Sequence, residues 1–89
     1  MAGPLEGIRV VDLTQVVSGP LATMLLADQG AEVVKVEPLG IGGDVTRLPS
    51  FAKAGISALF VNNNRGKRSL AVDLTKEEGK QIVIDLVEQ

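Results

Sequence analysis

A chain of 89 residues, 45% of them hydrophobic, is large enough for one globular domain and no more. Its formal net charge of −2 and its two Phe, without Tyr or Trp, argue against a nucleic-acid-binding protein, which needs a basic surface or stacking aromatic side chains. Cys and His are both missing, which excludes disulfides, thiolate nucleophiles, imidazole metal ligands and a catalytic Ser-His pair within this chain.

The start of the chain has none of the marks of a targeting sequence. Residues 1–6 lack a basic stretch followed by an apolar one, so we expect no secretory signal and a cytoplasmic protein. No apolar run approaches the ~20 residues that a membrane helix requires, so we expect no membrane partner.

Residues 7–37 have the pattern of a strand, a turn, a helix and a second strand. The apolar runs from Ile8 to Leu13 and from Val33 to Val36 predict parallel strands buried on both faces. Pro20 suits the first turn of a helix, and Gly30 suits a left-handed helix end. Between them lies an apolar stripe at helical spacing, made of Leu21, Met24, Leu25 and Leu26. Together these elements predict a right-handed βαβ unit.

The next segment, from Pro38 to Gly55, is a long connection rich in Gly and Pro, of a kind that is often functional. The run from Ser57 to Asn62 predicts a short helix. The Asn residues at 62–64 should end that helix, because Asn bonds to its own backbone and tolerates left-handed conformations. Regular alternation from Arg68 to Leu74 then predicts a third strand near a sheet edge.

The last element is predicted to be a helix that begins with a capping box. The Thr75 hydroxyl would accept the hydrogen bond of the third helical amide, and Glu78 would reach back to the Thr75 amide. The β-branched run at 81–84 leaves a strand as the alternative, although the cap and the length favour a helix. Gly79 inside this helix costs about 1 kcal/mol against Ala, and close packing against a neighbour is one explanation.

The order of elements predicts an α/β fold with Rossmann-like βαβ units and a three-stranded parallel sheet flanked by helices. No strand follows the last helix, and alternating elements of this kind invite a fourth strand. We therefore expect residues 1–89 to be the amino-terminal segment of a larger domain.

In an open parallel sheet, ligands bind beyond the carboxyl ends of the strands. In this sequence those ends are residues 14–20, 38–44 and 72–75. The helix start at Ser18 would favour an anion such as phosphate, with a simple helix cap at Ser18 as the alternative. Arg47 lies on the same side and is a better phosphate candidate than the basic residues Arg65, Lys67 and Arg68.

Other motifs in the sequence are weaker evidence for a binding site. The glycines at 40–43 are a weak dinucleotide fingerprint, and residues 66–69 lack the spacing and the following helix of a P-loop. The basic residues Arg65, Lys67 and Arg68 precede the third strand, so we expect them to be solvated or ion-paired with a neighbouring segment or subunit. For Asp12 and Asp73 we expect hydrogen bonds to loop amides rather than catalysis, and no metal site or catalytic carboxylate pair is indicated.

Five motifs, in order along the chain, resemble the amino-terminal region of the family III CoA-transferases, which include formyl-CoA and carnitine CoA-transferases and α-methylacyl-CoA racemase. They cover nearly the whole chain and are Gly3 to Thr14, Gly19-Pro20, Leu26 to Pro38, Gly42 to Asp44 with Arg47, and Asn64 to Leu74. The resemblance implies the Rossmann-like part of a large domain in a longer, interlocked homodimer. It also implies that the transferase nucleophile, an Asp, and the racemase acid/base pair lie downstream, so this chain holds no catalytic residue.

The resemblance further implies coenzyme A as the bound group, with acyl-CoA and carboxylic acid substrates. Carried over by position, the CoA contacts fall at Val17, Ser18, Val72, Asp73, Leu74 and Thr75, which are strand ends that the topology rule also selects. Some transferases have Arg at the position of Pro38 to meet a CoA phosphate, so Arg47 or another segment would supply that charge here. The alternatives are a racemase-type isomerase portion, an inactive binding or scaffold module, and a strand-swapping fragment without function.

Overall fold

The computed structural model describes residues 3–39, 43–47 and 57–89 of the chain. Within these ranges three strands, three α-helices and one 3-10 turn follow one another along the chain. In chain order they are β1 (Arg9–Asp12), α1 (Ser18–Asp28), β2 (Glu32–Pro38), η1 (Val45–Arg47), α2 (Ala58–Asn64), β3 (Lys67–Val72) and α3 (Glu77–Val87). The α/β class and the three-stranded parallel sheet predicted from sequence are confirmed.

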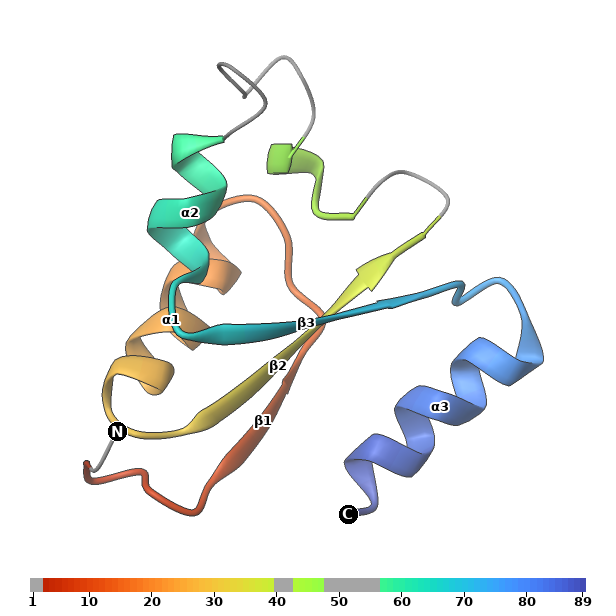
Figure 1. Cartoon of the computed structure of the whole chain (residues 1–89), viewed down its shortest axis with the longest axis horizontal. Helices are drawn as coiled ribbons and strands as arrows, with labels where there is room; N and C mark the ends of the chain where they lie inside the picture. Colours follow the sequence, from red (N-terminus) through yellow and green to blue (C-terminus); the bar gives the residue numbers. More distant parts are fainter. Residues whose placement is uncertain (1–2, 40–42, 48–56) are drawn as a thin grey trace.

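The sheet has the order β1-β2-β3, and both pairs of neighbours are parallel. Right-handed crossovers between neighbouring strands taken in sequence order must run over the same face of the sheet. Accordingly, α1 and α2 lie together to one side of the strands, and α3 lies to the other (Figure 1). The carboxyl ends of all three strands lie at one edge, as the parallel topology requires.

The central strand is buried as predicted, whereas β1 is not. Residues 33–37 of β2 are all buried, but Ile8 and Leu13 are 52% and 58% exposed and lie just outside β1. An edge strand has a neighbour on one side only, so the prediction that residues 8–13 are buried on both faces was wrong for β1.

Helix α1 begins and ends near the predicted positions, but its apolar stripe is mostly open. Gly30 has a φ of +101°, the left-handed conformation predicted for it. Of the stripe, Met24 is buried, while the side chains at 21, 25 and 26 are 39%, 52% and 37% exposed. Val17 is the N-cap residue and no side chain caps the helix, so the alternative of Ser18 as the cap is also wrong.

Helix α2 runs two residues further than predicted. Ser57 caps it by accepting a hydrogen bond from the Phe60 amide. The helix ends at Asn64, the last of the three Asn residues, rather than at Asn62. Asn63 and Asn64 are buried, and the Asn64 side chain donates to the Phe60 carbonyl at 3.0 Å. The amide group that was expected to disrupt the helix is therefore used to bond its preceding turn.

Strand β3 and helix α3 are confirmed, but the predicted capping box between them is wrong. Lys76, not Thr75, is the N-cap residue of α3, and no side chain makes a cap hydrogen bond. The Thr75 hydroxyl donates to Asp73 Oδ1 at 2.5 Å instead, and Leu74 lies beyond the end of β3. The hydroxyl therefore donates to a carboxylate two residues back instead of accepting from a helix amide.

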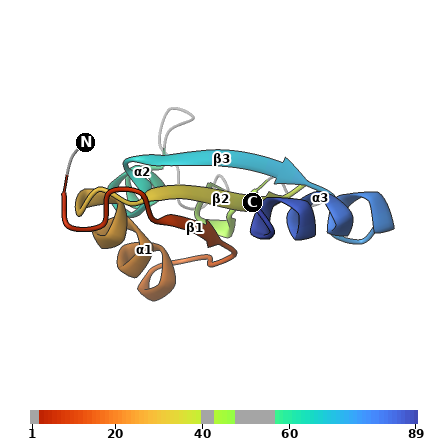
Figure 2. The ribbon, with the colours of Figure 1, turned by 90° about the horizontal axis from the view of Figure 1, so that it is seen from below.

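Helix α3 lies away from α1 and α2 and touches the rest of the fold lightly (Figure 2). Arg9 Nη1 donates to Gln89 Oε1 at 3.1 Å, and two hollows remain between α3 and the strands. Ile82, Ile84 and Val87 are 48%, 48% and 61% exposed. In the described part of the chain, no helix is both long enough and apolar enough to cross a membrane.

Gly79 lies against the end of β3 and the residue that follows it. A Cβ atom there would overlap the carbonyl oxygen of Asp73 and would lie 3.0 Å from a methyl group of Val72. This contact bears out close packing as the reason for a glycine inside the helix.

We expect Gly79→Ala to destabilise the chain by about 1–3 kcal/mol, because the added methyl group has no room. An exposed helix position would instead gain about 1 kcal/mol from the same substitution. Urea unfolding followed by circular dichroism measures the change, with Lys80→Ala on the exposed side as the control. A stabilised Gly79→Ala variant would contradict the packing of α3 described above.

Candidate functional site

The carboxyl edge of the sheet carries three turns of the same construction. In each, an Asp accepts hydrogen bonds from the main-chain nitrogen and the hydroxyl of the Thr two residues later, at 2.5–3.0 Å. Such side-chain bonds to the local backbone fix the chain where it leaves regular structure. The pairs are Asp12 with Thr14 after β1, Asp44 with Thr46 after β2, and Asp73 with Thr75 after β3. The prediction that Asp12 and Asp73 bond to loop amides is therefore confirmed.

Asp12 is also half of a buried ion pair. Its Oδ2 lies 2.8 Å from Lys67 Nζ and 2.8 Å from the Thr23 hydroxyl, and both members of the ion pair are at most 2% exposed. Burial raises the pKa of Asp12, but the hydrogen bonds from Lys67, Thr14 and Thr23 outweigh it and hold this pKa below its usual value. Asp12 is thus an ionised carboxylate that binds α1 and β3 to the end of β1.

A second buried ion pair lies beside the first on the same face of the sheet. Asp12 and Lys35 are register partners on β1 and β2, so their side chains point to one side. Lys35 Nζ lies 2.8 Å from Asp44 Oδ2 and donates to the Thr14 carbonyl at 3.0 Å. Burial raises the pKa of Asp44, and bonds from Lys35 and Thr46 lower it by more, so that the net pKa is below the usual value.

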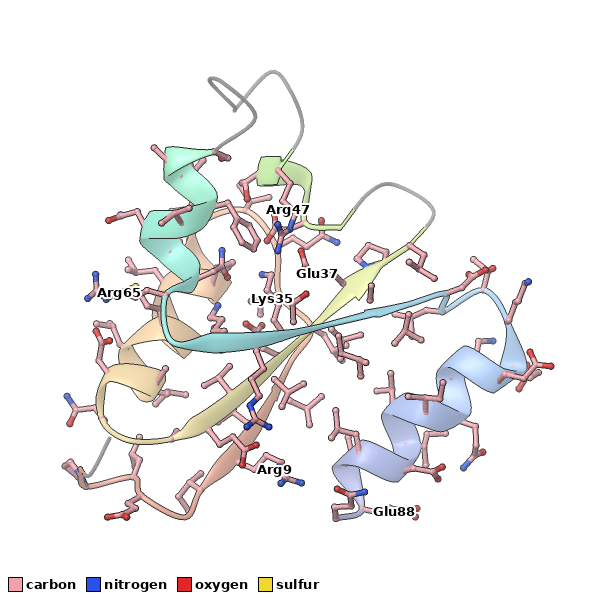
Figure 3. The ribbon with its side chains drawn as sticks, in the orientation of Figure 1. Arg9, Lys35, Glu37, Arg47, Arg65 and Glu88 are labelled. Atoms are coloured by element: carbon pink, nitrogen blue, oxygen red, sulfur yellow. The ribbon has the colours of Figure 1, made fainter. Side chains whose placement is uncertain are left out.

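Two residues further along β2, Glu37 holds Arg47. The guanidinium Nε and Nη2 atoms donate to the two carboxylate oxygens at 2.7 and 3.0 Å, a fork geometry that is among the strongest side-chain pairings. The Ser69 hydroxyl donates to the same carboxylate, and the guanidinium carbon lies 3.7 Å from the centre of the Phe60 ring. Figure 3 shows Lys35, Glu37 and Arg47 gathered on the α2 side of β2.

The pKa of Glu37 follows the same balance of forces. Burial raises it, and the hydrogen bonds from Arg47, Ser69 and the Asp44 amide lower it by more, leaving it below its usual value. Arg47 itself keeps 40% of its side chain exposed, so the guanidinium is held on one edge and open to solvent elsewhere. An anion could therefore still approach Arg47, against the partial neutralisation by Glu37.

The basic residues at the start of β3 form ion pairs with neighbouring segments, as one of the two sequence alternatives stated; Arg65 precedes the strand, whereas Lys67 and Arg68 are its first two residues. Arg65 pairs with Asp28 at 2.7 Å, and Arg68 pairs with Glu32 at 3.4 Å, both at the surface. The third of them, Lys67, is buried. Exposed pairs of this kind contribute little stability.

The turn between β1 and α1 contains an unusual backbone conformation. Val16 has a φ of +76°, which is rare for any residue but Gly and is strained for a β-branched one. A conformation of this kind costs about 1–3 kcal/mol and persists only where the surrounding structure imposes it. Val16 and Val17 are 44% and 41% exposed, and Ser18 is exposed as well.

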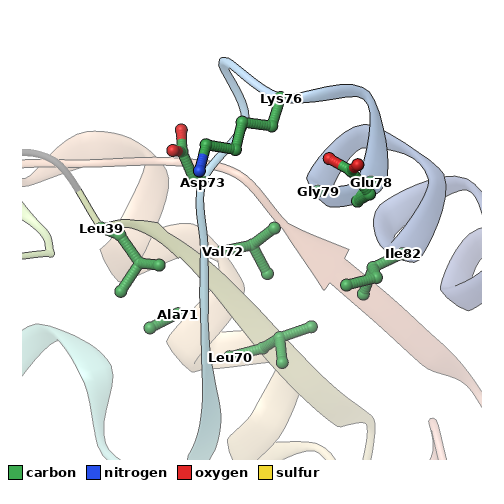
Figure 4. A pocket seen from close by; sticks show the side chains of 9 residues that line it. All are labelled: Leu39, Leu70, Ala71, Val72, Asp73, Lys76, Glu78, Gly79 and Ile82. Atoms are coloured by element: carbon green, nitrogen blue, oxygen red, sulfur yellow. The ribbon is translucent and has the colours of Figure 1, made fainter.

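Two adjoining hollows lie at the end of β3. The first, of about 250 Å³, has an apolar floor that includes Leu70, Val72 and Ile82, with Asp73 and Lys76 at its rim (Figure 4). The second, of about 340 Å³, is lined by Glu37, Pro38, Leu39, Gly43, Arg47, Ser69 and Ala71. Because Leu39 and Ala71 line both, the two hollows share a wall.

The proposed site residues therefore fall into three places on one edge. Val72 and Asp73 line the first hollow, Arg47 lines the second beside Pro38, and Leu74 and Thr75 follow in the turn after β3. Val17 and Ser18 lie at the start of α1 and line neither hollow. Residues 40–42 and 48–56, which complete the Gly- and Pro-rich connection, lie outside the described residues.

Sequence reasoning missed the buried charges. The strand predicted at 33–36 includes Lys35 without a role for its charge and stops before Glu37, although a spacing of two residues places both side chains on one face of β2. Asp44 was not singled out except as part of a motif. Charged residues at alternating positions of a strand that is otherwise apolar are the signal that could have found the network. No group of three acidic side chains able to hold a metal ion occurs within residues 3–39, 43–47 and 57–89.

Comparison with known proteins gives one consistent result. The family model for "CoA-transferase family III" matches residues 5–89. Succinyl-CoA:mesaconate CoA-transferase of Haloarcula hispanica is 49% identical over 98% of this chain and 23% of its own length. 2-Methylfumaryl-CoA isomerase of Chloroflexus aurantiacus is 37% identical over 98% of this chain and 21% of its own length.

A solved structure agrees with these relatives. The crystal structure of the hypothetical protein Rv3272 from Mycobacterium tuberculosis matches with a TM-score of 0.83 and 48% identity, over 96% of this chain and 23% of that one. The chain thus spans less than a quarter of the length of the relatives it matches, and its fold recurs there as part of a larger structure.

Acid should unfold this chain through its buried carboxylates. The usual pKa of a carboxyl side chain is near 4. The pKa values of Asp12, Glu37 and Asp44 lie below the usual one, so these groups contribute stability above about pH 4 that is lost as the pH falls through their folded-state pKa values. We expect the urea midpoint to be constant between pH 6 and 8 and to fall steeply below about pH 4.

The Asp12→Asn variant provides the matched test. It should be less stable at pH 7 and should lose less stability than wild type on acidification, because one of the titrating groups is gone. Asp85→Asn on the exposed side of α3 is the control. An Asp12→Asn variant with the wild-type pH dependence would rule out Asp12 as a contributor.

Proposed function

The chain belongs to CoA-transferase family III, and from this membership we propose that it forms part of the coenzyme A site of a transferase. Under this proposal the enzyme moves CoA from an acyl-CoA to a carboxylic acid, as relatives named for succinyl-CoA:mesaconate and succinyl-CoA:glutarate transfer suggest. The contacts to CoA are made by Val17, Ser18, the residues at 72–75, and Arg47.

The observation that carries the proposal is the convergence of these residues on one edge. Val17 and Ser18 follow β1, Arg47 follows β2, and residues 72–75 end β3, and all three strands are parallel. Ligands of open parallel sheets bind at this edge. The residues that the resemblance selects thus lie at the edge that the sheet topology selects.

Each part of the edge suits one part of CoA. The apolar hollow floored by Leu70, Val72 and Ile82 suits an apolar or ring-shaped group, with the Asp73 carboxylate as an acceptor at its rim. Arg47 suits a phosphate, because a guanidinium donates several hydrogen bonds in a fixed plane. Pro38 lines the hollow of Arg47 and can donate no hydrogen bond, so Arg47 carries the positive charge there.

Chemistry on the acyl group is assigned to residues outside this chain. The transferase nucleophile is a carboxylate that attacks the acyl-CoA thioester and splits one difficult step into easier ones. Asp12 and Asp44 are buried in ion pairs with Lys67 and Lys35 and are not available for attack. We propose that a downstream Asp fills this role in a homodimeric enzyme, and that this chain alone binds CoA without turning it over.

A second candidate is an isomerase that rearranges the acyl part of an acyl-CoA. Its support is the 37% identity to 2-methylfumaryl-CoA isomerase, which extends over the same residues. Both candidates use the same CoA site, so this chain contributes the same contacts to either. Assay of a protein that contains the downstream chain, with an acyl-CoA alone or with an added carboxylic acid, separates them.

Titration of the chain with CoA, followed by backbone amide NMR shifts, tests the proposed site. We expect shifts concentrated at 17–18 and 72–75, with no turnover of an acyl-CoA. A well-dispersed spectrum that does not move at millimolar CoA would overturn the proposal that this chain binds CoA. Separate titrations with 3′,5′-ADP and with pantetheine show which part of CoA each group of residues meets.

Arg47→Gln tests the phosphate contact, with Arg68→Gln as the control. Both arginines are partly exposed and ion-paired, but Arg68 lies on β3 near its amino end and pairs with Glu32. We expect Arg47→Gln to weaken 3′,5′-ADP binding about tenfold, as the loss of a charge-assisted bond predicts, and to leave pantetheine binding unchanged. Equal effects of the two substitutions would show that Arg47 acts only through net charge.

A further inference from the structure

The turn that precedes α1 is held in a conformation that its own residues do not favour. Val16 adopts a φ of +76°, and neither its side chain nor that of Val17 is buried enough to fix the turn by packing. Val17 has a φ of −127° and caps α1 without a side-chain hydrogen bond. Packing of Val16 and Val17 therefore does not account for the positive φ.

The buried ion pair of Lys35 and Asp44 contacts the main chain of this turn at two points. Lys35 Nζ donates to the carbonyl of Thr14 at 3.0 Å, and the main-chain nitrogen of Val16 lies 3.5 Å from Asp44 Oδ1. The same lysine and aspartate lie 2.8 Å apart, and their side chains are 1% and 0% exposed. One rigid, solvent-free unit thus bonds the main chain on both sides of residue 15.

The far side of the turn is closed by Gly19. A Cβ atom at Gly19 would lie 2.5 Å from the Cβ of Thr14, so the start of α1 is packed directly on the residue that Lys35 binds. The turn is held at Thr14 and at Val16 and has little freedom to relax between them.

We propose that Lys35 and Asp44 are positioning residues that impose the strained turn and so present the main chain of Val17 and Ser18 to CoA. This inference rests on the proposed function, which assigns Val17 and Ser18 to the CoA site. Neither Lys35 nor Asp44 touches the ligand, because both are buried beneath the turn. Their effect on binding is exerted through the backbone of residues 14–16.

The fold supplies its own control for a purely structural role. Lys67 and Asp12 form a second ion pair of the same length, 2.8 Å, whose side chains are equally buried. The Lys67 amino group bonds instead to the Pro20 carbonyl and to the Asn64 side chain. Its partner Asp12 accepts the bonds from Thr14, and Lys67→Met leaves that carboxylate in place. Removing either lysine leaves one buried carboxylate without its cation, so the two variants should lose similar stability.

The experiment compares Lys35→Met with Lys67→Met in the full chain. Two quantities are measured: the φ of Val16, from its Cα and Cβ shifts and its amide coupling constant, and the affinity for CoA, from amide shifts. We expect Lys35→Met to abolish the positive-φ signature and to weaken CoA about tenfold, which is about 1.4 kcal/mol. Lys67→Met should keep the signature and stay within about twofold of the wild-type affinity.

A rescue variant separates strain from general damage. Gly adopts positive φ at no steric cost, so Val16→Gly in the Lys35→Met background should recover most of the lost affinity. Asp44→Asn keeps the acceptor oxygen but not the charge, and should shift Val16 in the same direction by a smaller amount, which provides the measurement if Lys35→Met fails to fold.

Equal losses of affinity in Lys35→Met and Lys67→Met, or an unchanged Val16 φ in Lys35→Met, would overturn the positioning role. Failure of the proposed function looks different: the wild-type chain then shows no CoA-induced shifts at all. In that case a loss of positive φ confined to Lys35→Met would still show that Lys35 imposes the turn. It would no longer support a role of Lys35 in CoA binding.

Discussion

Two lysine ammonium groups, buried beneath α1 and α2 and each neutralised by a single carboxylate, are the constraint on which the rest of this structure depends. Among the described residues, six hydrophobic side chains are buried, and Asp12, Lys35, Glu37 and Asp44 are buried with them. Removing one partner of such a pair typically costs about 3–5 kcal/mol, because a buried charge is left uncompensated. Well-packed apolar side chains would often stabilise a fold as much, so what the pairs add is a defined geometry.

That geometry is set by the pattern of charges on β2. Lys35 and Glu37 point to the same face, and the segment that follows β2 returns with Asp44 opposite Lys35 and Arg47 opposite Glu37. If the segment slipped so that Arg47 faced Lys35, like charges would meet without solvent, at a cost of several kcal/mol. The alternation of signs therefore fixes where η1 sits, and with it the position of Arg47 on the ligand edge.

The sequence was sufficient for the local elements and for the edge at which they end. Hydrophobic period and turn residues identified the three strands and the helices, because those signals lie within about ten residues of one another. The errors concern side chains whose hydrogen-bond partners were not expected: the Thr75 hydroxyl donates to Asp73, and the Asn64 side chain donates to the Phe60 carbonyl, with the helix continuing to Asn64. The ion pairs could not be assigned, since Asp12 and Lys67 are 55 residues apart and only the register of β1, β2 and β3 brings them together.

The two faces of the sheet then have different parts in the candidate site. The face beneath α1 and α2 is closed by ion pairs and sets the backbone at Val16 and the position of Arg47. The opposite face, lined by residues such as Val72 and Leu70, is covered lightly by α3 and leaves an apolar hollow. The two faces meet at the carboxyl ends of the strands, so the proposed site has a charged side that suits a phosphate and an open side that suits an apolar group. A site of this kind depends on the charges lying on one face, which links the alternation at Lys35 and Glu37, on either side of Val36, to the proposed function.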